Sequence, residues 1–162
     1  MQYIHDATSL ASIADGSYEF LLASHILEHV ANPLLALREF HRVVKPKGHL
    51  LIAVPNQTHI FDHRRPVTTF EHLEGDLAAN TSEDDLTHLD EILALHDLEM
   101  DKPAGSPEEF RARCLRNLEV RCMHHHVFDL TLLDRALRSA GFRPLYGTDV
   151  WDIHVLIFAE RA

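Results

Sequence analysis

The sequence of 162 residues carries a formal net charge of -10 at pH 7, with 46% hydrophobic and 25% charged residues. These values are typical of one globular domain with a hydrophobic core, and the acidic balance disfavours nucleic acid as a partner. No apolar run is long enough to span a membrane, and the first residues do not resemble a signal peptide. Cys114 and Cys122 are too far apart along one predicted helix for a disulfide, so we expect a reduced, cytoplasmic protein.

Residues 15–56 predict a strand, a helix and a second strand, and the rest of the chain is organised around them. Residues 18–23 (YEFLLA) and 50–54 (LLIAV) are short apolar runs typical of buried strands. Between them Asn32 can cap a helix, and Pro33 suits its first position because a missing N–H has no cost there. The pattern therefore predicts a βαβ unit with parallel strands.

The two ends of this unit indicate where a ligand would bind. Pro46 cannot continue the helix, and Gly48 is expected to supply the turn into the second strand. Ligands of open α/β sheets bind beyond the carboxyl ends of the strands. Ser24 and His25 follow the first strand and Asn56 follows the second, so compact polar groups stand where a small molecule would bind.

Three phrases of this unit, DGSYEFLLASHILEHVANP, LREFHRVVKPKGHL and AVPN, resemble class I S-adenosylmethionine-dependent methyltransferases of the type-11-like group. HHHVFDLTLLDRALRSAGF resembles the helix that precedes the last two strands of that family. The resemblance covers about two thirds of the chain. It implies one α/β domain over residues 1–162, with a Rossmann-like, mostly parallel sheet and an antiparallel last strand. It also implies S-adenosylmethionine as cofactor and a small-molecule methyl acceptor. Lys47 replaces a glycine that is usual in the family.

The resemblance assigns the adenine end of the cofactor to the N-terminal residues. Residues 1–5 are expected to be the tail of a strand, and Asp6 and Ala7 follow it at the position that reads the adenine amino group in the family. By spacing alone, Asp6 or Thr8 serves equally well as the N-cap of a short helical turn.

The methionine end and the reacting groups fall after the first predicted strand. By resemblance, Ser24 and His25 line the methionine end of the cofactor, and His29 faces the methyl acceptor. A histidine that titrates near neutral pH can remove a proton from a hydroxyl or amine during transfer. In the alternative interpretation His29 only packs at the start of the helix, and Glu28 is solvated or caps backbone N–H groups.

The sequence lacks one part of the family pattern. No G-x-G occurs in the 162 residues, although the glycine-rich loop of the family should precede Asp6. The resemblance then implies a truncated fold without its first strands, which leaves residues 18–23 as an exposed apolar edge. We expect this edge to pair with a second copy or with a separate N-terminal segment. A fragment unable to bind cofactor alone and a non-catalytic, methyltransferase-derived binding module are the alternatives.

Residues 57–126 depart from the family pattern and are expected to form a helical insertion that covers the substrate. Ser82 is expected to cap a helix that extends to about Glu99, and Ser106 and Glu109 form a capping box that opens another. The predicted apolar face of that second helix consists of Phe110, Cys114, Leu118 and Cys122.

Three polar side chains are candidates for contacts with the substrate: Asn56, Arg64 and His126. Arg64 and its neighbour Arg65 suit a carboxylate or phosphate group on a substrate, although the sequence favours a solvated loop here. The run 124–126 consists of histidines, and on a strand only the first and third would converge. No nearby cysteine or carboxylate completes a ligand set at a recognised spacing, so no metal is assigned. A third interpretation of the sequence is that the histidines make this a metal-binding protein.

The C-terminal part predicts one helix and two strands. Asp129 or Thr131 caps the helix, and Gly141 is its left-handed C-terminal residue. Residues 142–146 and 153–159 are expected to pair as antiparallel strands that close one edge of the sheet.

Overall fold

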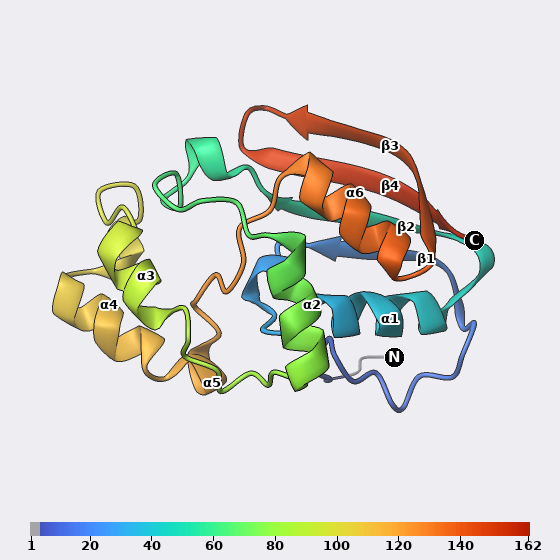
Figure 1. Ribbon diagram of the computed structural model, residues 1–162, viewed down its shortest axis with the longest axis horizontal. Coiled ribbons are helices and arrows are strands. Elements are labelled where there is room, and N and C mark those ends of the chain that lie inside the picture. Colours follow the sequence, from blue (N-terminus) through green and yellow to red (C-terminus); the bar gives the residue numbers. More distant parts are fainter. Residues whose placement is uncertain (1–3) are drawn as a thin grey trace.

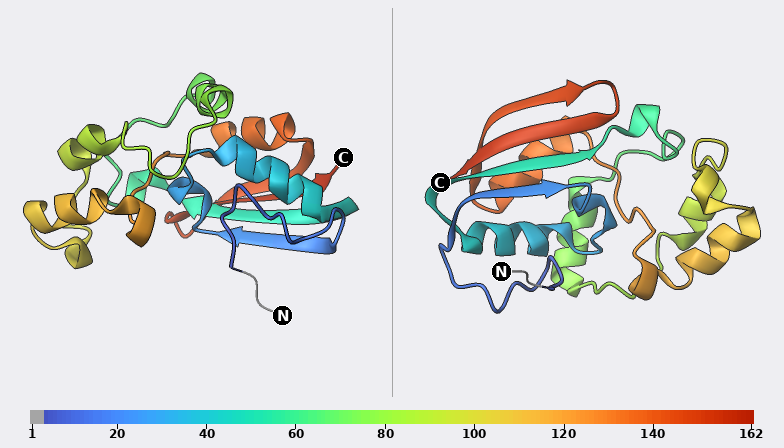
Figure 2. Two further views of the ribbon diagram at one scale, coloured as in Figure 1. Left: turned by 90° about the horizontal axis from the view of Figure 1, so that it is seen from below. Right: turned by 180° about the vertical axis from the view of Figure 1, so that it is seen from behind.

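A computed structural model describes residues 4–162, so most of the strand tail expected at residues 1–5 lies outside the described residues. The fold is a four-stranded mixed sheet with helices over one face (Figures 1 and 2). The order across the sheet is β1-β2-β4-β3. No helix in residues 4–162 has the length and apolar character needed to cross a membrane. The strands are β1 (Tyr18–Ser24), β2 (Val44–Pro55), β3 (Phe142–Val150) and β4 (His154–Arg161).

The α/β, Rossmann-like fold class is confirmed, and the prediction of a mostly parallel sheet needs a small correction. β1 and β2 are parallel, whereas β4 is antiparallel to both β2 and β3. Because the last strand lies between β2 and β3, antiparallel pairing predominates, even though β1, β2 and β3 run in the same direction. The strands β3 and β4 also extend beyond their predicted ends.

The main core lies between the sheet and three helices. Leu50 and Ile52 of β2 and Leu37 and Leu133 of the helices are fully buried there. The predicted caps are confirmed, since Asn32 accepts the N–H of Leu35 at 3.1 Å and Asp129 caps the last helix. These helices are α1 (Pro33–Val43), α2 (Phe70–Ala79) and α6 (Leu130–Ser139).

A second, smaller core lies beside the sheet, where Figure 1 shows α3, α4 and α5 apart from the main layers. Ile92, Phe110 and Met123 form its centre, and the capping box of Ser106 and Glu109 is present as predicted. Its elements are α3 (Leu89–Leu95), α4 (Pro107–Cys114) and α5 (Asn117–Val120). The remaining helices are the short 3-10 turns η1 (Leu27–His29), η2 (Gln57–His59) and η3 (Lys102–Ala104).

Two helix predictions in this region are wrong in extent. The helix expected from Ser82 begins only at Leu89, because side chains before it bond locally, as Thr87 Oγ1 does to Asp85 at 2.6 Å, and such bonds compete with helical ones. The next helix ends at Cys114 instead of running on.

The early end of that helix changes the environment of the two cysteines. Because the chain turns after α4, Cys114 and Cys122 belong to the same small core, and the neighbouring thiol of Cys114 lowers the pKa of Cys122 to about 7. The prediction that a continuous helix separates the two cysteines is therefore wrong. Both are free thiols. Leu118, expected on the same apolar face, is 58% exposed.

The turn between α1 and β2 also differs from the prediction. The strand begins at Val44, so Pro46 and Gly48 belong to it. Lys47, not Gly48, has the left-handed backbone, with φ 65°. Gly48 is needed for close packing instead, because an added Cβ would lie 2.8 Å from the carbonyl oxygen of Lys45 and 2.9 Å from that of Glu19.

The sheet face opposite the helices is uncovered in residues 4–162, as the left view of Figure 2 shows. β1 is the edge strand, and Phe20 and Leu22 on this face are 51% and 58% exposed. Leu22 pairs with Leu51 in β2, which pairs with Phe158 in β4. The predicted exposed, apolar edge is therefore present.

Candidate functional site

A pocket of about 520 Å³ lies at the carboxyl end of β1. It gathers four of the predicted site residues, two from the N-terminal segment and two from the loop after β1. Its lining residues are Ile4, His5, Asp6, Ala7, His25, Ile26, His29, Val30, Glu83 and Arg121.

The carboxylate of Asp6 is held by two groups at one wall of this pocket. Its Oδ1 accepts hydrogen bonds from the N–H and the hydroxyl of Thr8, at 2.9 and 2.7 Å. Its Oδ2 accepts one from Arg121 at 2.9 Å. Burial raises the pKa of Asp6, but these hydrogen bonds and the Arg121 charge outweigh it and lower the pKa overall. Asp6 is therefore an anion that retains further acceptor capacity, since a carboxylate has about four lone-pair sites.

Arg121 links the N-terminal segment to the rest of the domain through two ion pairs. Besides Asp6 it pairs with Glu83, and the other oxygen of Glu83 accepts the N–H of Ala31 at 3.1 Å. Sequence reasoning missed both residues. Both residues lie in the region that departs from the family pattern, so their opposite charges were the one signal in the sequence that could have indicated an ion pair.

His25 has a strained backbone at the rim of the pocket. Its φ is 51°, a left-handed value that is costly for a residue with a Cβ and that recurs at functional sites. Its Nε2 lies 2.9 Å from Nδ1 of His154, and its Nδ1 lies 3.5 Å from Glu28. Burial and the neighbouring His154 lower the pKa of His25. Sequence analysis assigned His154 no role.

His29 presents one free ring nitrogen toward a buried carboxyl group. Its Nδ1 donates to the carbonyl oxygen of Met123 at 3.0 Å, which assigns the lone pair to Nε2, 4.0 Å from Oε1 of Glu28. Burial lowers the pKa of His29 to about 4, so the ring is neutral at pH 7 and the expectation that it titrates near neutral pH is wrong. A neutral imidazole with a free nitrogen can accept a proton.

Glu28 is buried, and the prediction that it is solvated or caps N–H groups is wrong. Its residue is 2% exposed, and neither carboxyl oxygen has a hydrogen-bond partner within residues 4–162. Burial raises the pKa of Glu28 to about 7. The loop after β1 thus combines a neutral histidine with a carboxyl group that exchanges protons near neutral pH.

Four further predicted residues do not line the pocket. Ser24 is the exposed end of β1, and Asn56 caps η2 by accepting the N–H of Thr58 at 3.1 Å. Arg64 pairs with Asp97 at 2.6 Å. His126 is 1% exposed, with Nε2 3.2 Å from the carbonyl oxygen of Ala31. Each of the last three already has a partner in the protein.

The comparisons with known proteins agree with this architecture. A sheet ordered β1-β2-β4-β3, with its last strand antiparallel and a pocket beyond β1, defines a Rossmann-like α/β domain. Residues 2–146 match the family model described as "Methyltransferase domain", so the chain belongs to this family. No curated protein sequence matches it significantly.

Three solved structures show the same fold at low identity. A SAM-dependent methyltransferase from Aquifex aeolicus is 14% identical, with a TM-score of 0.52 over 98% of this chain and 53% of its own. A Haloferax volcanii methyltransferase in complex with the Trm112 activator is 12% identical, with a TM-score of 0.53 over 98% and 60%. The [4+2]-cyclase SpnF is 15% identical, with a TM-score of 0.52 over 98% and 54%. The chain thus spans between half and two thirds of the length of these structures.

Proposed function

We propose that this chain takes part in S-adenosylmethionine-dependent methyl transfer to a small acceptor at the pocket beyond β1. The observation that carries the proposal is the convergence of Asp6, Ala7, His25 and His29 in that one pocket. Its volume of about 520 Å³ falls within the range of about 300–1,000 Å³ that is usual for small-molecule and cofactor sites.

The pocket residues suit the parts of this cofactor. The charged Asp6 has acceptor capacity for an adenine amino group, with Ala7 beside it, while His25 would stand at the methionine end, next to Ser24, which lies outside the pocket lining. The cofactor, when bound, supplies a methyl group already activated on a sulfonium. What the protein adds is position and one proton acceptor. Asn56 and Arg64 stay predicted substrate residues, at sites away from the pocket, whereas His126 is 1% exposed and is not proposed for this role.

His29 is the proposed base for the acceptor. Its Nε2 is free because Nδ1 donates to Met123, and its ring lines the pocket. A hydroxyl or amine within hydrogen-bond reach of Nε2 would give up its proton there as the new bond to the methyl group forms. The carboxyl group of Glu28, 4.0 Å away, can take part in removing that proton.

A non-catalytic binding module is the second candidate. One observation favours it: no G-x-G occurs in the 162 residues. Function depends on the site and not on the scaffold.

Calorimetric titration with S-adenosylmethionine and S-adenosylhomocysteine separates the two candidates. We expect micromolar binding that Asp6→Asn weakens at least tenfold, and that the exposed-site control Asp90→Asn leaves unchanged. We expect His29→Gln to keep cofactor binding and to lose methyl transfer from labelled cofactor to hydroxyl and amine acceptors. A folded chain that binds neither compound at millimolar concentration would refute a cofactor site in this chain.

The uncovered β1 edge supports a proposal about partners. Unpaired apolar strands invite pairing, and the chain covers 53% of the Aquifex structure. We expect a second copy, or a separate N-terminal segment, to lie along β1. Sedimentation equilibrium should show self-association that Leu22→Lys abolishes. A wild-type chain that stays monomeric at high concentration and binds no such segment would contradict this.

A further inference from the structure

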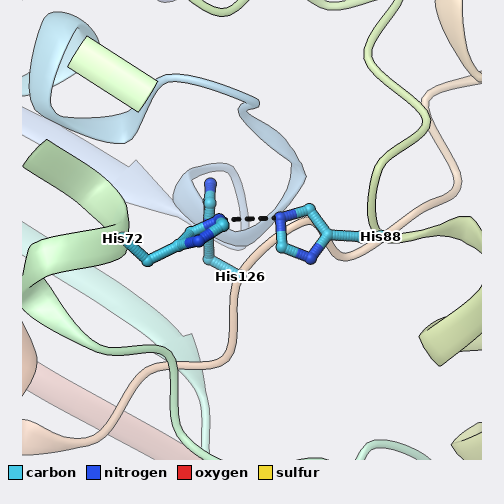
Figure 3. Close-up of side chains that lie close together, drawn as sticks. All are labelled: His72, His88 and His126. Carbon is cyan, nitrogen blue, oxygen red and sulfur yellow. Dashed lines mark hydrogen bonds between the residues drawn. The ribbon is translucent and has the colours of Figure 1, made fainter. Parts of the chain in front are cut away.

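Three histidines from separate parts of the chain meet in one cluster (Figure 3). His72 lies in α2, and His88 stands immediately before α3. His126 belongs to the segment that leads into α6. Each offers a ring nitrogen, and the three nitrogens lie within 4.8 Å of one another. Spacing in the sequence could not reveal this cluster, because the fold alone brings its members together.

The distances match those between ligands of one metal ion. Two ligands bound at about 2.0–2.1 Å in a tetrahedral arrangement lie about 3.3 Å apart. Nε2 of His72 lies 3.1 Å from Nε2 of His88. The same atom lies 3.4 Å from Oδ2 of Asp76, one helical turn further along α2.

The carboxylate of Asp76 lies beside the three histidines, although it is not one of the residues whose ligand atoms all lie within 4.8 Å of one another. Its Oδ2 is buried without a hydrogen-bond partner among the residues that the structure describes and lies 3.6 Å from Nε2 of His126. As a ligand, this nitrogen would exchange its 3.2 Å hydrogen bond to the carbonyl oxygen of Ala31 for the ion. Nδ1 of His126 is likewise buried and without such a partner. Buried polar atoms without partners are rare in native proteins, and an ion or ordered water is a common explanation.

An ion can reach this cluster from solvent. A separate pocket of about 210 Å³ is lined by His72, His88 and neighbours that include Thr68, Thr69 and Glu91. The side chain of His72 is 41% exposed, whereas that of His126 is fully buried. The cluster is therefore open to solvent at His72 and enclosed by protein at His126.

We propose that His72, His88, His126 and Asp76 form a binding site for a divalent transition metal, with zinc as the best match. Imidazole nitrogens with one carboxylate oxygen are ligands that Zn²⁺ prefers. The ion would join α2, the start of α3 and the segment before α6, and so fix the helical insertion against the main core. It would thereby stabilise the folded chain, since a ligand that binds only the folded state raises stability.

The test measures zinc binding by the full-length chain without a histidine tag. Titration of metal-free protein with Zn²⁺ should give one ion per chain and a higher melting temperature. His88→Ala and Asp76→Asn should each weaken binding at least about tenfold. His59→Ala, at an exposed histidine outside the cluster, should leave the affinity unchanged. Circular dichroism checks that each variant is folded, and anomalous diffraction at the zinc edge locates the ion.

A second cluster provides the decisive comparison. Glu28, His29 and His124 also have ligand atoms within 4.8 Å of one another. Zinc that is lost in His29→Gln but kept in His88→Ala would place the ion there and overturn the proposal. Equal affinity in the wild type and in folded His88→Ala would overturn it too, as would a folded wild-type chain that takes up no zinc at millimolar concentration.

Discussion

Adjacent arginines in the loop before α2 occupy opposite environments and allow a matched mutational test. Arg65 is 2% exposed and donates to Glu91 at 2.8 Å, to Asp62 at 3.2 Å and to the carbonyl oxygens of His124 and His125. Its neighbour Arg64 has a side chain that is 51% exposed and pairs only with Asp97 among the contacts described. The same change, arginine to methionine, can be made at both positions.

The expected cost differs severalfold between the two sites. Arg65→Met leaves the 2%-exposed carboxylate of Asp62 without its guanidinium partner and leaves two buried carbonyl groups without donors. Removal of one partner from such a buried pair costs about 3–5 kcal/mol. Loss of an exposed pair costs about 0–1 kcal/mol, which is the expectation for Arg64→Met. For a chain of this size, the larger loss lowers the melting temperature on the order of 10 °C.

Urea denaturation monitored by circular dichroism measures both free energies of unfolding. We expect Arg65→Met to lose at least about 2 kcal/mol more than Arg64→Met, with similar slopes in urea. Equal losses, or a larger loss at Arg64, would refute the assignment of Arg65 as the buried link between the loop before α2 and the backbone of His124 and His125.

The remaining predictions concern acid stability and two backbone positions. Because the pKa of His29 is lowered to about 4 in the folded chain, the unfolded chain takes up a proton on this residue at a higher pH than the folded chain does. The contribution of His29 to the unfolding free energy is therefore fully present above about pH 6.5. It falls as the pH drops toward 4, by about 2 kcal/mol at pH 5. His29→Gln should flatten the pH dependence of the unfolding free energy over that range, and an unchanged profile would contradict the assignment. Gly48→Ala should destabilise by about 1–3 kcal/mol, since its Cβ would meet backbone oxygens. Gly75→Ala, inside α2 with open space around it, should stabilise by up to about 1 kcal/mol, and chemical denaturation of the pair checks both signs. Lys47→Gly should gain stability, because Lys47 has φ 65° and glycine adopts that conformation without steric cost; a loss measured in the same assay would contradict this.

The regular parts of the fold could be predicted because their signals are local. Short apolar runs of strand length and caps such as Asn32 and Asp129 depend on residues within a few positions. The position of β4 in the sheet is a tertiary property, so the family resemblance was needed to predict its antiparallel direction. The extent of the helix after Ser82 was overestimated, because the local hydrogen bonds of its first residues compete with the helix.

The site was predictable only where its residues belong to a family phrase. His25 and His29 lie in the first such phrase, and Asp6 and Ala7 were assigned by their position before it in the family; the structure brings all four into one pocket. Glu83 and Arg121, which complete its wall, come from the insertion, where no pattern relates them to Asp6. Pairing between residues so distant in the sequence depends on the path of the chain, which composition and spacing do not encode.

The position of the last strand has a consequence for the chain during its synthesis. β2 pairs with β4 along seven residue pairs, from His49 with Glu160 to Pro55 with His154. At about 5–20 residues per second, a ribosome needs on the order of 5–20 s to make the segment between these two strands. During that interval the apolar edge of β2 has no permanent neighbour on one side. A nascent chain is therefore most prone to aggregate after its insertion has emerged and before its final eight-residue strand does, and it depends on chaperones most in that window.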